Sequence, residues 1–293
     1  PSGLPTIPSG SIIIITATYF NSINDVIEES GAEVQVYDAG HLFAELLKDT
    51  SGFSMADAVD IGRIYFDLDK KTDLYLHENS DDVVVTSVDV VVTERCSMKC
   101  ANCANLMQFY TKPVHVDSLT IQQSLDLLMK SVKRVNELRL IGGEPFMNKD
   151  LHNFVDLCTG YENGLKVIIY TNGTIIPRPE QLISFQNKKV FFEITNYKLL
   201  SRKLNQLTDV LNENNIKYKI KELPDTWDDS GDIEDYNYSE SELESVFKNC
   251  CAINLATLMH GSLYRCPFSA NLDALDVVNF KSVDKLDLQC EDG

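Results

Sequence analysis

From residue 83 onward, the chain alternates between short apolar runs rich in β-branched residues and longer stretches with apolar residues at helical spacing. The stretch 118–135 shows the helical spacing, with Ile121, Leu125 and Leu128 on one stripe and Asp117 or Ser118 as its cap. The predicted strands are residues 87–93, 137–141, 166–170, 190–195 and 216–221, and the predicted helices are 118–135, 150–159, 179–185 and 199–214. Repeated strand–helix units of this spacing indicate a parallel α/β sheet or barrel, which places its chemistry at the C-terminal strand ends.

The first 82 residues carry a shorter version of this alternation. We predict strands at 11–19 and 34–37 and helices at 22–30 and 41–47, with Gly31 placed to end the first helix. The order resembles part of a Rossmann-like α/β unit. It contains no Gly-x-Gly-x-x-Gly, so we predict no dinucleotide site. We expect a domain boundary in the polar stretch 49–82.

Composition and charge exclude several classes of protein. Of the 293 residues, 44% are hydrophobic and 24% charged, as in a folded globular protein. The formal net charge of −18 argues against nucleic acid as a partner. No apolar run is long enough to span a membrane, and the run at 12–15 lacks the length and basic flank of a signal peptide. We therefore expect a cytoplasmic protein without membrane contact.

Three of the eight cysteines lie within eight residues, as Cys96-x3-Cys100-x2-Cys103. In a reducing compartment such a group binds metal more often than it forms disulfides. A structural zinc site takes four tetrahedral ligands, usually in paired Cys-x2-Cys knuckles, and that pairing is absent here. Iron–sulfur clusters normally take four thiolates, so three close together leave one iron open to a substrate or cofactor.

The cysteine loop follows the first predicted strand of the α/β region, and Gly142-Gly143-Glu144-Pro145 follows the second. In this combination the chain resembles the radical S-adenosylmethionine (SAM) superfamily. The resemblance implies a partial (β/α)6 barrel with a [4Fe-4S] cluster on Cys96, Cys100 and Cys103. The family usually has an aromatic residue before the third cysteine, whereas this chain has Asn102.

The same resemblance assigns the cofactor site. In the family, the open iron chelates the amino and carboxylate groups of SAM, and one electron from the cluster cleaves SAM to methionine and a 5′-deoxyadenosyl radical that takes hydrogen from the substrate. Gly142 and Gly143 would let the backbone approach SAM, Glu144 would accept from its ammonium group, and Pro145 would end the strand. By resemblance, Asn172 and Asn196 at the next two strand ends would bind the ribose and carboxylate of SAM.

The C-terminal cysteines form a second pattern. Cys251, Gly261 and Cys266 are spaced as in the first half of the SPASM/Twitch auxiliary-cluster domain of radical SAM enzymes, with the glycine allowing a hairpin. The later SPASM cysteines are missing, so the resemblance implies a shorter, Twitch-like unit with one auxiliary iron–sulfur cluster. Either Cys250 or Cys251 would be a ligand, and Cys290 would complete the set. Cys158 lies on an apolar helical face and is expected in the core.

The segment around Trp227 is strongly acidic. We interpret it as a solvated loop, and we hypothesise that Trp227 and Asp228 approach the substrate. The predicted organisation is a partial Rossmann-like segment at 1–82, the radical SAM partial barrel at 83–222, the acidic loop at 223–246 and the Twitch-like unit at 247–293.

Three functions are compatible with these features. The first is hydrogen abstraction from a small metabolite, such as a nucleotide-linked sugar, that ends in oxidation, elimination or epimerisation. The second is modification of a peptide, as in many SPASM/Twitch proteins. The third is a non-catalytic iron–sulfur electron carrier or regulator, which would give Glu144 and its glycines no role. Either enzyme reading requires a reducing partner such as flavodoxin or ferredoxin.

Overall fold

The computed structural model describes residues 12–15, 27, 31, 34–38, 83–223, 233–234, 236–248, 250, 252, 255–278, 281 and 284–289. The chain divides into two compact units, residues 1–82 and 83–293. Within the described part of the first unit, β1 (Ile12–Ile15) pairs in parallel with β2 (Gln35–Asp38). The helices expected at 22–30 and 41–47 lie outside the described residues, apart from Ile27, which is helical.

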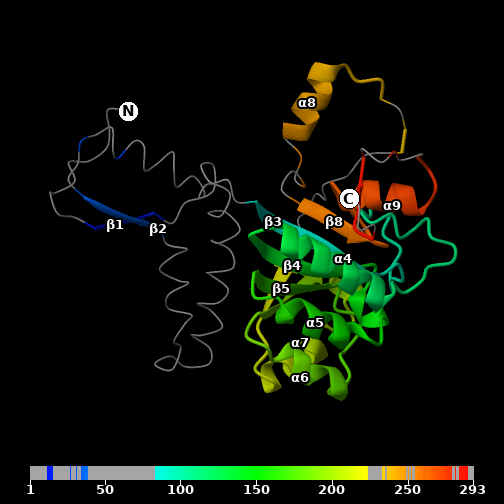
Figure 1. Cartoon of the computed structure of the whole chain (residues 1–293). Coiled ribbons are helices and arrows are strands. Elements are labelled where there is room, and N and C mark those ends of the chain that lie inside the picture. The colour runs from blue at the N-terminus through cyan, green and yellow to red at the C-terminus, as the bar shows by residue number, and fades with distance from the viewer. Residues whose placement is uncertain are drawn as a thin grey trace. The chain divides into compact units, whose positions relative to one another are not determined.

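The second unit is built on one eight-stranded sheet with the order β10-β9-β8-β3-β4-β5-β6-β7 (Figure 1). Its parallel strands are β3 (Val84–Thr93), β4 (Arg134–Gly142), β5 (Gly164–Thr171), β6 (Val190–Asn196), β7 (Tyr218–Glu222) and β8 (Leu255–Met259). The predicted parallel α/β sheet is thereby confirmed. β9 (Ser262–Tyr264) and β10 (Leu286–Asp287) continue it as antiparallel strands, so the C-terminal hairpin belongs to the same sheet.

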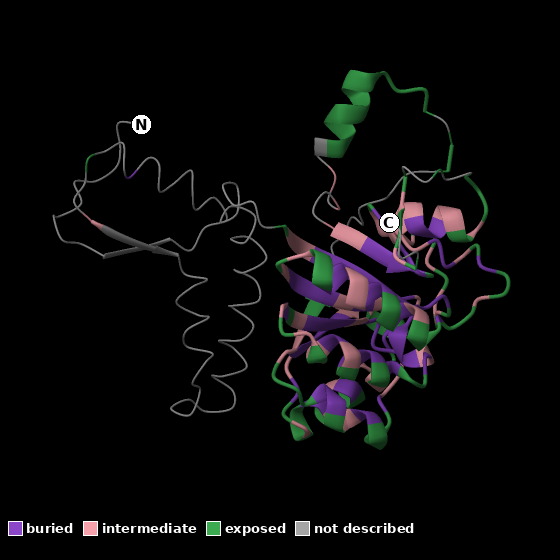
Figure 2. Ribbon diagram, in the orientation of Figure 1, coloured by how far each residue is buried: buried purple, intermediate pink, exposed green. Residues whose placement is uncertain are grey.

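Helices cover one face of this sheet. They are α4 (Ser118–Ser131), α5 (Leu151–Gly160), α6 (Leu182–Phe185) and α7 (Leu204–Glu213), with short 3-10 turns at η1 (Pro145–Met147), η2 (Pro179–Gln181) and η3 (Lys198–Leu200). Buried residues concentrate on the strands and on the sheet-facing sides of these helices (Figure 2). The core between them includes Val90, Leu140, Ile169 and Leu125, and also Cys158, which is fully buried as expected.

Two expected elements differ in extent. The helix expected to reach residue 135 ends at Ser131, and the chain has already entered β4 at Arg134. The acidic loop expected at 223–246 contains α8 (Glu240–Lys248) at its end. Ser239 begins this helix, because its backbone N–H and hydroxyl both donate to the Glu242 carboxylate, at 2.8 and 2.6 Å. The last helix, α9 (Pro267–Ala274), follows β9 directly.

No helix among the residues that the structure describes is long and apolar enough to cross a bilayer.

Candidate functional site

Three neighbouring strands end beside one another and carry the predicted cofactor motifs. β3 ends at Thr93, three residues before Cys96, β4 ends at Gly142 and β5 ends at Thr171. The backbone joins the first two ends, because Gly143 N donates to Thr93 O at 3.0 Å and Glu144 N donates to Arg95 O at 2.8 Å. The Gly142–Pro145 turn is therefore fixed against the entrance of the cysteine loop.

Gly143 shows why this turn needs glycine. A Cβ atom at this position would fall on the carbonyl oxygen of Arg95 and come within 2.7 Å of the Cys96 Cβ. Both obstacles are close to the main chain and cannot swing aside as a long side chain would. The glycine therefore allows the β4 turn and the cysteine loop to lie in direct contact.

All three cysteines of the loop are half-buried free thiols. Burial, together with the charges of Glu144 and the other two cysteines, raises the pKa of Cys96 to about 11, although the Met98 N–H opposes the shift. Burial and the neighbouring Cys103 also raise the pKa of Cys100. Negative charge on the neighbouring cysteines therefore opposes ionisation of Cys96 and Cys100, and binding of iron would relieve that repulsion.

This donor set fits an iron–sulfur cluster better than a single metal ion. No three His, Cys, Asp or Glu side chains of the described residues converge on one point that could hold an ion. A cubane bonds each thiolate to a separate iron, so its cysteines need not converge in that way. The chemistry of three adjacent soft thiol ligands suits an iron–sulfur cluster.

Glu144 is fully buried and joins β4 to β5. Its carboxylate accepts from Asn172 N at 2.8 Å, Thr171 Oγ1 at 2.8 Å and Phe146 N at 3.2 Å. Burial raises its pKa to about 7 even though these three hydrogen bonds lower it. In this structure the carboxylate binds its own chain, and it keeps lone-pair capacity for one further donor such as an ammonium group.

Asn172 lies against the cysteine loop. Its Nδ2 donates to Ser97 Oγ at 3.0 Å, and its Oδ1 accepts from Thr174 Oγ1 at 2.6 Å. Asn196, one strand further, instead donates to the Glu222 carboxylate at 2.9 and 3.0 Å. The structure thus brings Asn172 to the cysteines and pairs Asn196 with the end of β7.

Tyr197, which follows β6, lies near the cysteine loop, although no motif in the sequence marks it. Burial raises its pKa, and the negative charge that thiolates would carry at Cys100, Cys103 and Cys96 raises it further. Its side chain therefore lies in the electrostatic field of the cysteine loop. The aromatic residue after Thr195-Asn196 was the available signal.

The remaining residues predicted from the sequence are the C-terminal cysteines and the acidic segment around Trp227. Cys250 and Cys266 are both half-buried, while Cys251 and Cys290 lie outside the described residues, so the auxiliary cluster stays a prediction. Cys266 begins α9, where its Sγ accepts from Ser269 N at 3.4 Å. Trp227 and Asp228 also lie outside the described residues.

The face of the sheet opposite the core carries a buried charged cluster. Asp89 and Arg139 are register partners on β3 and β4, and their side chains pair at 3.0 Å. The Arg139 guanidinium lies 4.5 Å from the centre of the Tyr170 ring, and Tyr170 is the register partner of Glu193 on β6. Burial lowers the pKa of Arg139, but Asp89 and the other facing groups raise it overall, so its positive charge persists.

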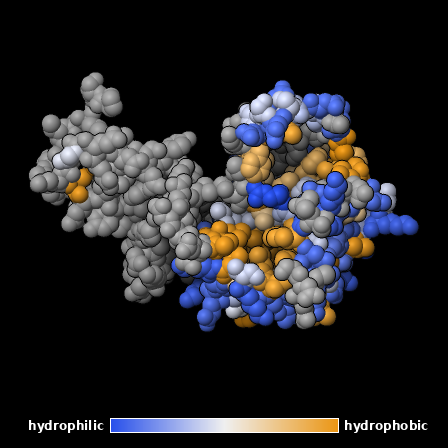
Figure 3. Space-filling model, turned by 45° about the horizontal axis from the view of Figure 1, so that its top comes forward, coloured by the Kyte–Doolittle hydropathy of each residue, from blue (hydrophilic) through white to orange (hydrophobic). Residues whose placement is uncertain are grey.

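An open hollow of about 510 Å³ lies beside the cysteine loop. It is lined by Cys96, Arg95, Lys112, Pro113, Val114 and Met147. Arg95 and Lys112 make it basic in a chain of formal net charge −18. On the face seen in Figure 3, hydrophobic residues gather in the middle of the second unit and hydrophilic residues lie around its edges.

Part of the chain is similar in sequence to known proteins. Residues 90–195 match the model of the radical SAM superfamily. A GTP 3′,8-cyclase of Campylobacter fetus is 32% identical over 101 residues, which cover 34% of this chain and 31% of that protein. A GTP 3′,8-cyclase of Nautilia profundicola is 33% identical over 87 residues, 29% of this chain and 27% of that protein. The chain thus spans less than a third of the length of these relatives.

Solved structures show weaker likeness. BtrN in complex with AdoMet and 2-DOIA is 18% identical and aligns over 65% of this chain and 76% of its own, with a TM-score of 0.47. Streptococcus suis SuiB bound to S-adenosylmethionine is 15% identical and aligns over 68% of this chain and 47% of its own, with a TM-score of 0.41.

Proposed function

We propose that this chain, whose residues 90–195 match the radical SAM superfamily model, is an enzyme that uses SAM and a [4Fe-4S] cluster to take hydrogen from a small polar metabolite. When bound, cluster and SAM supply a 5′-deoxyadenosyl radical at the expense of one external electron. The observation that carries the proposal is the hydrogen-bonded junction of the cysteine loop with the Gly142–Pro145 turn and with Asn172.

In this proposal the chain's own residues hold and orient the cofactors. Cys96, Cys100 and Cys103 bind three irons and leave the fourth for SAM. Gly142, Gly143 and Pro145 shape the turn that faces SAM, and Glu144 accepts from its ammonium group. Asn172 and Asn196 orient the ribose and carboxylate. The fixed backbone around Glu144 supports this, because a rigid acceptor stays in place when SAM arrives.

A small polar substrate, such as a nucleotide-linked sugar, fits the charged face of the sheet. Asp89 lies four residues before the end of β3, and Tyr170 lies two residues before Asn172. These charged and polar side chains therefore lie roughly 7–13 Å from the strand ends that carry the cofactor motifs. A site with buried carboxylates, a guanidinium and a phenol binds hydroxyl and amino groups better than apolar chains. Oxidation, elimination and epimerisation are all compatible with it. The likeness to GTP 3′,8-cyclases covers about 100 residues, too little to bring their substrate to this chain.

The hollow beside Cys96 supports an acidic protein, such as a flavodoxin or ferredoxin, as the electron donor. Arg95 and Lys112 lie next to the first cluster ligand, and an acidic partner would be attracted to this patch while the rest of the acidic chain repels it. Lys112→Glu should reduce SAM cleavage supported by such a protein several-fold and leave cleavage supported by dithionite unchanged. Equal losses with both reductants would contradict this docking site.

The test of the function is anaerobic reconstitution of the full chain with iron, sulfide, SAM and dithionite. We expect 5′-deoxyadenosine and methionine from the wild type and neither from Cys96→Ala, while Cys158→Ala, a change far from the loop in sequence, should keep the activity. If wild-type protein with its full complement of iron, sulfide and SAM forms no 5′-deoxyadenosine, the enzyme proposal is wrong and the electron-carrier interpretation remains. Transfer of deuterium from labelled candidate metabolites into 5′-deoxyadenosine would then identify the substrate.

A further inference from the structure

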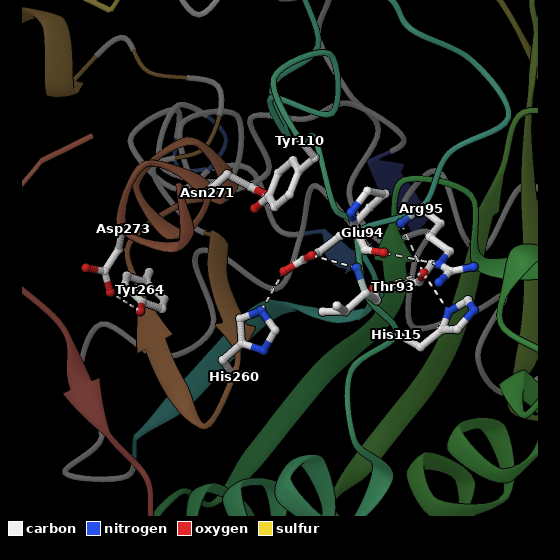
Figure 4. A network of polar contacts seen from close by, with 11 residues as sticks. Thr93, Glu94, Arg95, Tyr110, His115, His260, Tyr264, Asn271 and Asp273 are labelled. Atoms are coloured by element: carbon white, nitrogen blue, oxygen red, sulfur yellow. Dashed lines mark hydrogen bonds and ion pairs between the residues drawn. The ribbon is translucent and has the colours of Figure 1, made fainter. Parts of the chain in front are cut away.

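Two polar contacts join the C-terminal hairpin and helix to the two ends of the cysteine loop (Figure 4). His260 Nε2 lies 2.8 Å from Glu94 Oε1, and Tyr110 Oη donates to Asn271 Oδ1 at 2.7 Å. Glu94 precedes Cys96 by two residues, and Tyr110 follows Cys103 by seven. The cysteine loop, residues 94–110, is therefore held at its entrance and at its exit by the C-terminal part of the chain.

Both anchors on the loop are buried and otherwise fixed. Glu94 is 7% exposed, and its second carboxylate oxygen accepts from Val114 N at 2.8 Å. Tyr110 is 8% exposed. Its partner Asn271 is fully buried, with Nδ2 donating to Pro267 O at 2.7 Å. The Tyr110–Asn271 contact therefore lies inside the structure, where a hydrogen bond holds its geometry better than one exposed to water. In the other contact the Glu94 carboxylate is buried, while the His260 side chain is 40% exposed.

The hairpin turn that carries His260 has an unusual residue choice. β8 and β9 are joined by His260 and Gly261 alone, both with positive φ, at 48° and 86°. A two-residue turn of this kind favours Asn followed by Gly, although histidine, like asparagine, adopts positive φ more readily than most residues. Histidine supplies a longer side chain than asparagine at this position, and that side chain reaches Glu94.

The loop itself has little regular structure to keep it ordered. Between Thr93 and Asp117 the chain forms no helix and no strand, only an isolated bridge between Thr93 and His115. A cluster needs its three thiols placed within a fraction of an ångström, so the order must come from contacts with other elements. The Gly142–Pro145 turn supplies contacts on the β4 side, and the β8–β9 turn lies on the other side because β8 pairs with β3.

We propose that His260 and Asn271 are positioning residues that hold the cysteine loop in the geometry required for cluster binding. The consequence for catalysis rests on the proposed function, but the positioning is a property of the chain before any cofactor binds. We call the His260–Glu94 and Tyr110–Asn271 contacts together the clamp. Because Cys266 lies between His260 and Asn271 in the sequence, the clamp also links the C-terminal cysteine region to the loop.

Hydrogen–deuterium exchange of the cofactor-free full chain tests the clamp directly. His260→Asn keeps a residue suited to the turn but is too short to reach Glu94, and Tyr110→Phe removes only the hydroxyl that binds Asn271. Each should speed exchange in residues 94–110 about fivefold, the effect of losing one typical hydrogen bond, and leave α5 unchanged. His260→Gln, which keeps a donor within reach, should exchange like the wild type.

Lys285→Ala is the matched control, because it removes the contact with Asp273 inside the C-terminal part without touching the loop. After reconstitution and gel filtration, His260→Asn and Tyr110→Phe should retain less iron per chain and give a broadened electron paramagnetic resonance signal, whereas His260→Gln and Lys285→Ala should match the wild type. Unchanged exchange in residues 94–110 of both loop variants, or an equal effect of Lys285→Ala, would overturn the clamp. If the exchange results support the clamp but the wild type forms no 5′-deoxyadenosine, only the proposed enzymatic function is refuted.

Discussion

The carboxyl group of Glu144 should make the cofactor-free protein less stable as pH rises through neutrality. The side chain is fully buried, and burial raises its pKa to about 7 in spite of hydrogen bonds from Asn172, Thr171 and Phe146. In the unfolded chain the same group has an ordinary carboxyl pKa. We therefore expect Glu144→Gln, which cannot ionise, to remove one component of the pH dependence of folding.

The sign and size follow from proton linkage. Between about pH 4.5 and pH 7 the folded state holds the Glu144 proton more tightly than the unfolded state does, so the free energy of unfolding falls as pH rises. The contribution is fully present below the unfolded pKa and is lost above the folded one. A pKa difference of roughly 2.5 units corresponds to about 3 kcal/mol. The substitution itself leaves an amide N–H₂ facing the Asn172 N–H, at a cost of ~1–3 kcal/mol at every pH.

Urea unfolding followed by circular dichroism, under reducing and cofactor-free conditions, measures this contribution. The difference in free energy of unfolding between wild type and Glu144→Gln should shift by about 2.5 kcal/mol between roughly pH 5 and pH 8, with the variant gaining on the wild type as pH rises. Glu180→Gln is the control, because that side chain is 59% exposed and lies outside the buried Glu144 site. A wild-type-minus-variant difference that is the same at both ends of the range would refute the reasoning.

Four further outcomes follow from the structure. Gly143→Ala should displace the cysteine loop through its contact with Arg95 O and reduce iron binding, whereas Gly160→Ala, with nothing within 4 Å of its Cβ, should stabilise the fold by about 0.5–1 kcal/mol. Cys158, fully buried with a pKa that burial raises to about 12, should escape maleimide labelling in the native protein and react only after unfolding, as mass spectrometry would record. Asp117→Ala should lower the free energy of unfolding by about 1 kcal/mol in urea titrations, because Asp117 caps α4; an unchanged midpoint would contradict the cap.

The sequence predicts the parallel sheet because each strand and helix has its own local period. It predicts the end of α4 poorly, since Val132 and Val135 continue the apolar spacing of the helix although the chain turns after Ser131 and enters β4. Whether the helix continues or β4 begins there depends on pairing with the neighbouring strand, and local periodicity carries no information about that pairing. For the same reason the pairing of β8 with β3 could not be read from the sequence, because its partners are more than 160 residues apart.

Some features of the candidate site can likewise be predicted from local sequence, whereas others depend on contacts between distant segments. The three cysteines and the Gly142–Pro145 turn are recognisable because each is a short motif whose residue types follow from what the local backbone must do. The role of Tyr197 and the contact of His260 with Glu94 arise only when distant segments meet, the latter across 166 residues. A histidine before glycine in a hairpin was the one local signal for the second contact.

The two sides of the cysteine loop are held by different kinds of contact, and this difference has consequences. On the β4 side the contact is backbone against backbone, so Gly143 has almost no permitted replacement. On the β8 side the contacts are side-chain hydrogen bonds, which single substitutions weaken without breaking the sheet. The position of the loop relative to SAM should therefore be set by the β4 turn, while its rigidity is set by the C-terminal hairpin and helix. Changes at His260 or Asn271 should accordingly alter cluster retention before they alter the fold.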